Sequence, residues 1–226
     1  MKCDLHVHTC YSYDSSAHPE VMINTAIKKG ISCLAITDHN EIEGAKKAVR
    51  LAKNRPILII PGLEIKSKAG DILALGVKEI IPSALSAKKT IQEIKKAGGW
   101  AFIPHPFGFN CSFREDLKKL VDIIDGIEVL NASLFASGNK KALAFAKKYN
   151  LPFIAGSDAH SPEFLGKAYL EIAGDNLSQE QVFEKIKNRQ VRIEGQEANF
   201  LEKVLDHSMR NMIRAHYYAI GKKRKI

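Results

Sequence analysis

The sequence has no long hydrophobic run. None of its apolar stretches approaches the roughly 20 residues that a membrane-spanning helix needs. The first residues, MKCDLHVH, lead directly into a predicted strand without the apolar segment of a signal peptide. We therefore expect a cytoplasmic protein that does not enter a membrane.

Cysteine is scarce, and internal repeats and low-complexity segments are absent. The four cysteines lack both the CxxC spacing of a structural zinc site and the density of a disulfide scaffold, so we interpret them as reduced thiols. The absence of a repeat excludes a solenoid, and the absence of low-complexity sequence excludes a disordered scaffold. With 45% hydrophobic residues, the 226-residue chain can bury one sizeable core.

Positive charge is present in excess and is concentrated near the C-terminus. The formal net charge is +9, and the segment from Leu201 onward contributes +5 of it through seven basic and two acidic residues. A basic balance favours anionic partners such as phosphorylated metabolites or nucleic acid. The rest of the chain is only mildly basic.

Short apolar runs alternate with segments of helical period, which is the pattern of βα units around a parallel sheet or barrel. We count about seven such units. Strands are expected at residues 3–7, 33–37, 57–65, 72–77, 100–103, 126–130, 153–155 and 168–172, with 72–77 as a hairpin-like addition. Helices are expected at residues 19–29, 41–54, 90–97, 115–122, 139–149 and 178–188. Pro19 suits the first turn of the first helix, and Ser178 caps the last.

After Gly195 the pattern changes to one long helix. Its apolar residues recur near helical spacing: Leu201, Val204, Leu205, Met209, Met212, Ile213, Tyr217 and Ile220. We therefore divide the chain into a barrel, residues 1–196, and a basic amphipathic helix with its tail, residues 197–226. Two interpretations of this helix stay open. It packs onto the barrel or a partner subunit by its apolar stripe, or it binds nucleic acid through its clustered lysines and arginines.

Residues that bind metals follow the ends of five predicted strands. His6 and His8 are two apart, so in a strand both rings point to the same side. The same spacing recurs at Asp158 and His160 after a later strand. Three further strand ends carry Asp38 with His39, then Glu64, then His105. Because barrel enzymes build their sites from several strand ends, we expect these side chains to converge on divalent metal ions.

Other roles are possible for some of these residues. Asp38 can cap the following helix or support a ligand, and His39 can belong to a surface turn. His105 lies between two prolines and can be a rigid-loop histidine. Glu64 follows a strongly apolar run, where an unpaired carboxylate is costly to bury, so a metal or another cation is its expected partner.

Five segments, DLHVHTCYSYD, AITDHN, PGLEI, IPHP and GSDAH, occur in this order. They resemble the successive motifs of the PHP (polymerase and histidinol phosphatase) superfamily, over residues 1–195. The resemblance implies a distorted (βα)7 TIM-like barrel with an extra C-terminal helix here, and up to three divalent metals, typically zinc, manganese or iron. It assigns one metal to His6, His8, Glu64 and Asp158. It assigns a second to Glu64 and His105, and a third to Asp14, His39 and His160.

One position departs from the pattern of the family. The family usually has a histidine in a segment that resembles GEIHLLG, but residues 70–76 read GDILALG, with Leu73 at that position. Leu73 cannot coordinate a metal, and Asp71, on the same strand face, is a possible substitute. We therefore expect two or three divalent metals, with weak or substrate-assisted occupancy at the Glu64 and His105 site.

A divalent metal lowers the pKa of bound water from about 15.7 to near 7 and neutralises charge on a phosphoryl group. We therefore expect a metal-dependent phosphoesterase that hydrolyses a nucleotide, a short oligonucleotide or another small phosphomonoester by metal-activated hydroxide. His160 or Asp158 is expected to assist proton transfer. Arg114 and Asn131 are candidate substrate-binding residues, although Asn131 could instead order its own loop.

Two alternatives remain. The resemblance also permits a histidinol-phosphate phosphatase, although such enzymes are usually longer. With Leu73 as a sign of lost catalysis, the chain could instead be a non-catalytic module that binds nucleic acid or a partner through its basic helix. No feature of the sequence assigns an oligomeric state.

Overall fold

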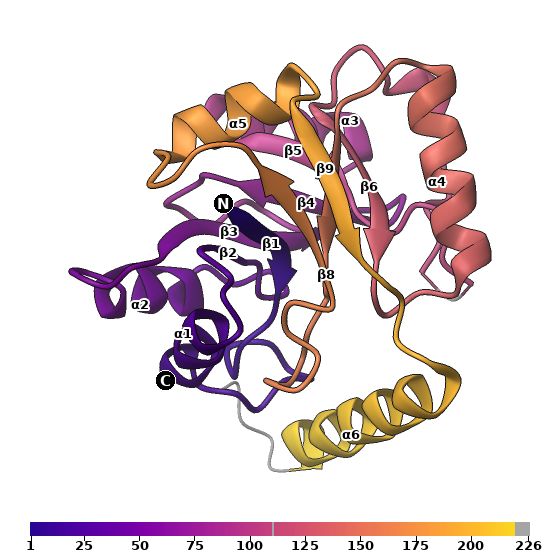
Figure 1. Ribbon diagram of the computed structural model, residues 1–226. Helices are drawn as coiled ribbons and strands as arrows, with labels where there is room; N and C mark the ends of the chain where they lie inside the picture. Colours follow the sequence, from indigo (N-terminus) through magenta and orange to yellow (C-terminus); the bar gives the residue numbers. More distant parts are fainter. Residues whose placement is uncertain (110, 220–226) are drawn as a thin grey trace.

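The computed structural model describes residues 1–109 and 111–219. Nine strands form a sheet in the order β7-β6-β5-β4-β3-β2-β1-β8-β9 (Figure 1). The strands are β1 Lys2–Val7, β2 Cys33–Ile36, β3 Leu58–Lys66, β4 Asp71–Leu75, β5 Trp100–Ile103, β6 Gly126–Asn131, β7 Phe153–Gly156, β8 Ala168–Ile172 and β9 Val191–Gly195. The helices are α1 Pro19–Lys28, α2 Glu43–Leu51, α3 Ala87–Lys96, α4 Ala136–Lys148, α5 Gln179–Lys187 and α6 Phe200–Ala219.

The sheet curls into a nearly closed barrel. Strands β1 to β3 are parallel, β4 runs antiparallel to β3 and β5, and β5 to β7 are again parallel. The segment after β7 meets β1, where the Asp158 N–H donates to the His6 carbonyl at 2.8 Å and the His8 N–H donates to the Ala159 carbonyl at 2.9 Å. The predicted α/β barrel is confirmed, and so is the antiparallel strand expected at 72–77.

Gly156 makes the close approach at this seam possible. A Cβ at this position would stand 2.5 Å from the Cβ and 2.7 Å from the backbone nitrogen of His6, closer than real contacts allow. The seam therefore needs a residue without a side chain, and its geometry sets the positions of His6 and Asp158.

Two buried hydrophobic clusters hold the barrel together. One lies between the sheet and helices α1 to α4, with Met22, Ile65 and Ile94 among its members. The other joins the strands to α5 and includes Leu73 and Phe183. Burial of apolar side chains on this scale is the main favourable contribution to folding, and it leaves the opposite end of the barrel to polar residues.

The helix termini show why several predictions held. Pro19 occupies the first turn of α1 as expected. Ser178 caps α5 because its hydroxyl accepts the Gln181 N–H at 3.3 Å, while the Gln181 side chain accepts the Ser178 N–H at 2.8 Å. This reciprocal capping box satisfies two backbone donors that a helix start otherwise leaves unpaired.

Two elements differ from the predictions. The helix expected at 115–122 is wrong, since only Leu117–Lys119 forms a single 3-10 turn. Leu117, Leu120 and Ile124 are buried at helix-like spacing, but the chain turns there instead of continuing as a helix. The strand β9 was not predicted; it follows α5 and pairs antiparallel with β8, which lies beside β1.

Helix α6 lies across the end of the barrel, below β1 and β8 in the view of Figure 1. Its apolar stripe is largely solvent-exposed, with Leu201, Leu205 and Met212 among the exposed residues, whereas Asp206 is buried. The barrel therefore leaves most of the stripe exposed and receives the charged face instead, while packing of the stripe onto a partner subunit stays a prediction. Ile220 and the basic run 222–225 lie outside the described residues. Within the part of the chain that the structure describes, every helix is too short or too polar to cross a bilayer.

Candidate metal centre

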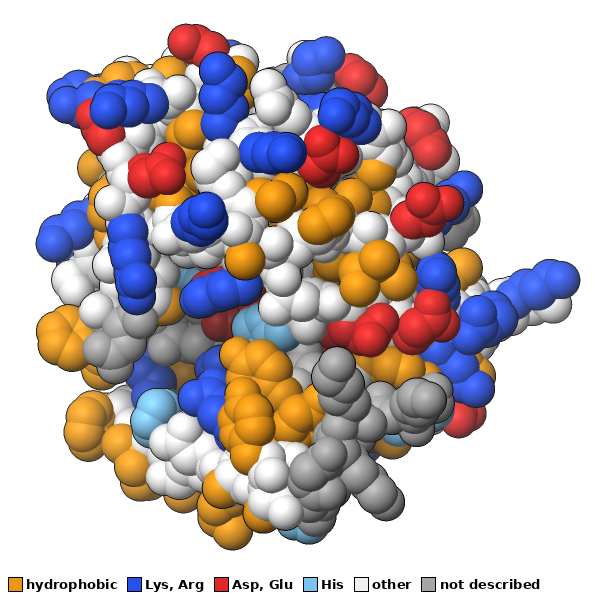
Figure 2. Space-filling model, turned by 180° about the vertical axis from the view of Figure 1, so that it is seen from behind, with side chains coloured by type: hydrophobic (Ala, Val, Ile, Leu, Met, Phe, Trp, Pro, Cys, Tyr) orange, Lys and Arg blue, Asp and Glu red, His pale blue; other side chains and the backbone are white. Residues whose placement is uncertain are grey.

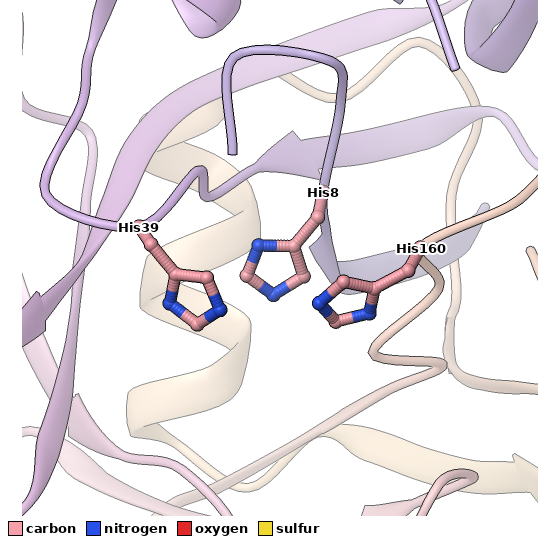
Figure 3. Close-up of side chains that lie close together, drawn as sticks. All are labelled: His8, His39 and His160. Carbon is pink, nitrogen blue, oxygen red and sulfur yellow. The ribbon is translucent and has the colours of Figure 1, made fainter. Parts of the chain in front are cut away.

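The eight side chains expected to bind metals lie together at the end of the barrel that α6 covers. His6 belongs to β1 and Glu64 to β3, and the others occupy the loops that follow β1, β2, β5 and β7. Figure 3 shows three of them, His8, His39 and His160, side by side although they come from three separate segments. All eight are buried except His39, whose side chain is 13% exposed.

The Nε2 atoms of His6 and His8 lie at the middle of one group, and an oxygen of Glu64 and of Asp158 lies near both of them. Nε2 of His6 lies 3.1 Å from Nε2 of His8 and 3.6 Å from an oxygen of Glu64 and of Asp158. Nε2 of His8 lies 3.5 Å from the same Glu64 oxygen and 3.2 Å from the same Asp158 oxygen. A tetrahedral ion with bonds of 2.0–2.1 Å would place its donors about 3.4 Å apart. The distances from the two histidines suit one divalent ion, and His6, His8 and Asp158 offer ligand atoms that lie within 4.8 Å of one another.

A second group contains Asp14, His39 and His160. Nε2 of His160 lies 3.4 Å from Oδ1 of Asp14, and Nε2 of His39 lies 3.5 Å from Oδ2 of the same carboxylate. Oδ1 of Asp14 and both Nε2 atoms are buried without a hydrogen-bond partner among the described residues. Buried polar atoms are normally paired, so these three atoms also fit a cation.

The third group is less complete. Nε2 of His105 lies 2.9 Å from Oε1 of Glu64, and His6 is the other residue of this group. Leu73 pairs directly with Glu64 across β3 and β4, so its side chain lies on the same face of the sheet as this ligand. A histidine there could bind the ion, but Leu73 is fully buried among apolar side chains. Asp71, the possible substitute, forms an ion pair with Lys66 at 3.0 Å.

Glu128 in β6 was not predicted, and it orients the centre. Its Oε1 lies 3.1 Å from Nδ1 of His6, and its Oε2 accepts the His105 N–H and the amide of Asn131, each at 2.9 Å. A carboxylate at Nδ1 leaves the Nε2 lone pair of His6 free for a metal. The sequence signal for Glu128 was a carboxylate within the apolar run GIEVL. No other metal-binding residue type stands beside it in that run, so the sequence did not identify it as a candidate.

Asp38 supports the loop after β1. It accepts the Thr9 N–H at 2.6 Å, the Thr9 hydroxyl at 2.7 Å and the Ser12 hydroxyl at 3.0 Å. Ser12 in turn lies 3.1 Å from Nδ1 of His8. Of the roles left open for Asp38, the structure supports that of a partner that positions a ligand. Burial raises the pKa of Asp38 to about 6, with these hydrogen bonds opposing the rise.

The histidines and carboxylates of the centre are buried close together, and this shifts several of their pKa values. Burial, and then the neighbouring His160 and His39, lower the pKa of His8 to about 3. Burial also lowers the pKa of His39, but the carboxylates of Glu64 and Asp14 outweigh it and raise the pKa to about 10. Burial opposes ionisation of Asp158, yet the nearby histidines, His6 first, hold its pKa well below the usual range. The centre thus combines ionised carboxylates with a protonated imidazole, an arrangement in which bound cations can replace protons.

A cavity of about 830 Å³ connects this centre to the surface. Its walls include Tyr13, His39, Glu64 and Asp158 on the barrel side and Lys203, Asp206, His207, Arg210, Asn211 and Arg214 from α6. In Figure 2 the hollow lies between the barrel and the row of side chains at the bottom of the view, with basic side chains inside it and histidines at its edge.

Comparisons with known proteins agree with this picture. Residues 136–191 match the family model described as PHP-associated. A solved two-domain protein from Bacteroides vulgatus, described as containing a predicted PHP-like metal-dependent phosphoesterase, superposes with a TM-score of 0.75 at 22% identity. The superposition covers 87% of this chain and 65% of that one.

The chain is similar to the PHP superfamily in its fold and, over residues 136–191, in its sequence. Two proteins of Methanocaldococcus jannaschii, both described as uncharacterized, are similar to this chain in sequence. MJ1587 is 40% identical over 143 residues, which is 58% of this chain and 82% of the relative. MJ0417 is 31% identical over 187 residues, which is 78% of this chain and 73% of the relative. The barrel has the fold of PHP-like metal-dependent phosphoesterases, and its donor set suits divalent metals.

The two predicted substrate-binding residues differ in their positions. Arg114 is exposed and is not among the residues that line the cavity, and its N–H donates to the Ala69 carbonyl at 2.7 Å. Asn131 is fully buried, and its amide donates to Glu128 at 2.9 Å and to Asp158 at 3.3 Å. Its side-chain Oδ1 accepts the Ser133 N–H at 2.9 Å, which supports the other role considered for Asn131, that of ordering its loop.

Proposed function

We propose that this protein is a metal-dependent phosphoesterase that hydrolyses a small phosphomonoester, with nucleotides and short oligonucleotides as the first candidates. The observation that carries the proposal is a buried site in which the Nε2 atoms of His6 and His8 lie 3.1–3.6 Å from each other and from an oxygen of Glu64 and of Asp158. Such a concentration of ligand atoms has no evident structural purpose, since burying them unpaired is costly.

We assign the side chains to ions as the family resemblance implies. His6, His8, Glu64 and Asp158 would hold one ion, and Asp14, His39 and His160 would hold another. Glu64 and His105 offer a weaker third position, because Leu73 supplies no ligand. Mixed imidazole and carboxylate sets suit zinc, manganese or iron. When bound, such ions make hydroxide available near neutral pH and neutralise charge on the phosphoryl group.

The protein itself orients the ligand side chains and supplies groups that can accept a proton. Glu128 and Asn131 fix the first group, because both lie within hydrogen-bond distance of its members. Nδ1 of His160 lies 2.9 Å from the backbone carbonyl of Asp158, which holds the proton on Nδ1 and leaves Nε2 as an acceptor. His160 can therefore bind an ion or accept a proton during hydrolysis, as Asp158 can through its carboxylate. The burial of the site excludes bulk water and strengthens these interactions.

The test is release of inorganic phosphate by metal-replete protein from a panel of nucleoside monophosphates, 5′-phosphorylated oligonucleotides and histidinol phosphate. Asp158→Asn should reduce turnover by at least 100-fold, in the range expected when an essential group is removed. The exposed His216→Gln, a histidine outside the centre, should retain full turnover. No phosphate release from any member of the panel, with zinc, manganese or iron supplied, would refute the proposal.

A further inference from the structure

Helix α6 turns its charged face toward the metal centre. Asp206, Arg210 and Arg214 follow one another at four-residue spacing and so share one side of the helix, and all three line the cavity. The apolar residues Leu205 and Met212 are exposed instead. Surface helices normally bury their apolar side. An interaction other than apolar burial therefore selects the inward face of α6.

The two arginines converge on a single carboxylate oxygen beside the metal centre. Nη2 of Arg214 lies 3.1 Å from Oδ2 of Asp14, and Nη2 of Arg210 lies 3.5 Å from the same atom. Arg210 is also held by Asp206 at 3.6 Å, and the guanidinium of Arg214 stacks over the ring of Tyr13 at 5.2 Å. Both guanidiniums are thus fixed at the edge of the second ligand group.

The arginines offer more donors than this carboxylate can accept. Nε of Arg214 is buried and has no hydrogen-bond partner among the described residues. A buried donor without an acceptor costs about 1–3 kcal/mol, so native structures rarely leave one unpaired. The unpaired donor points to an anion that the site is built to receive.

We propose that Arg210 and Arg214 bind the terminal phosphate of the substrate, so that α6 forms one wall of the active site. This inference rests on the proposed function. The planar guanidinium forms bidentate hydrogen bonds with phosphate oxygens, and two of them side by side suit a multiply charged group. A terminal phosphate carries about −1.5 to −2 at pH 7. A phosphodiester carries only one negative charge, so the arginine pair favours monoesters.

The cavity supports the same class of substrate. Its volume of about 830 Å³ falls within the range of about 300–1,000 Å³ typical of small-molecule sites. Lys203, Arg210 and Arg214, the basic residues of α6 that the sequence associated with nucleic acid, all line this cavity. The charge of the helix is therefore directed at a ligand between α6 and the barrel.

The experiment is calorimetric titration of the full-length, metal-replete protein with inorganic phosphate, which needs no turnover. Arg210→Gln/Arg214→Gln should weaken phosphate binding by at least 30-fold, and the lysine pair Arg210→Lys/Arg214→Lys should recover part of the loss. Arg192→Gln is the matched control, because Arg192 of β9 pairs with Glu171 of β8 and neither residue lines the cavity. It should bind phosphate as the unmodified protein does. Metal content and the unfolding temperature are measured for every variant.

The outcomes distinguish the phosphate-binding role of the two arginines from the proposed phosphoesterase activity. Phosphate affinity within two-fold of the unmodified protein in the glutamine pair overturns the inference, even if phosphomonoesters are hydrolysed. Loss of bound metal in both the glutamine and lysine pairs also overturns it, because the arginines would then serve only to hold Asp14. Arginine-dependent phosphate binding without any hydrolysis supports the inference and removes the proposed function instead.

Discussion

Glu128→Gln is the most informative single substitution at the centre, because it changes charge and hydrogen bonding with almost no change in volume. The carboxylate faces three groups that can donate: Nδ1 of His6, the His105 N–H and the amide of Asn131. A glutamine has one oxygen and one NH₂ group, so it cannot accept from both sides.

Either orientation of the glutamine side-chain amide removes a metal ligand or leaves buried donors unpaired. With its NH₂ toward His6, the ring must accept at Nδ1, which moves the proton to Nε2 and removes a metal ligand. With its oxygen toward His6, the NH₂ faces two donors, which costs about 1–3 kcal/mol for each unpaired buried group. Loss of such a supporting partner typically weakens metal affinity by about 10–100-fold.

The assay is competition for zinc against a chelating fluorophore, with urea unfolding of the metal-free protein in parallel. We expect Glu128→Gln to raise the metal Kd at least ten-fold, and Glu171→Gln, half-buried in β8 and outside the cavity lining, to leave it unchanged. If both variants bind zinc with the affinity of the unmodified protein, Glu128 does not set the tautomer of His6 and the reasoning fails.

Three further predictions concern the same centre. At pH 7 the metal-free protein should carry a proton on His39, whose pKa of about 10 lies above the ambient pH. Titration of metal in buffers of different ionisation enthalpy should therefore show His39→Asn releasing about one proton fewer, and an unchanged count would exclude the charged ring. Gly156→Ala should destabilise the protein by about 1–3 kcal/mol in urea, because its Cβ would overlap His6, and it should also weaken metal binding; Gly30→Ala, with open space around it, should leave metal affinity intact. Leu73→His, opposite Glu64 on the same face, should raise metal content by one ion per chain, and elemental analysis giving the original stoichiometry would argue against a vacant ligand position.

The barrel and the convergence of most candidate ligands were predictable because their signals are local. These candidates lie in or directly after apolar runs that indicate buried strands, and parallel strands of a barrel end at a common face. Asp14 is the exception, since only the family resemblance pointed to it. His6 with His8 and Asp158 with His160 also repeat a spacing that places both side chains on one side. Chemistry and topology therefore agree at these positions.

The residues that position the ligands, and those proposed to contact the substrate, could not be predicted from the sequence in the same way. Glu128 is an isolated carboxylate inside a strand, and its role depends on contacts with residues distant in sequence. Helical period identified two faces of α6, but it did not show which one packs inward. The contact between Asp14 and Arg214 joins residues 200 positions apart, and it reverses the usual rule that apolar faces are buried. Arg114 was chosen for its place in a loop, and a loop position does not determine the direction of a side chain.

The claim that these side chains bind divalent ions is best tested by anomalous diffraction at the zinc edge, from crystals of the full-length protein soaked with zinc and inorganic phosphate. We predict one strong peak among His6, His8, Glu64 and Asp158 and a second beside Asp14, His39 and His160. We expect phosphate between these ions and the two arginines Arg210 and Arg214. Peaks confined to other parts of the surface, with these side chains unligated, would contradict this claim.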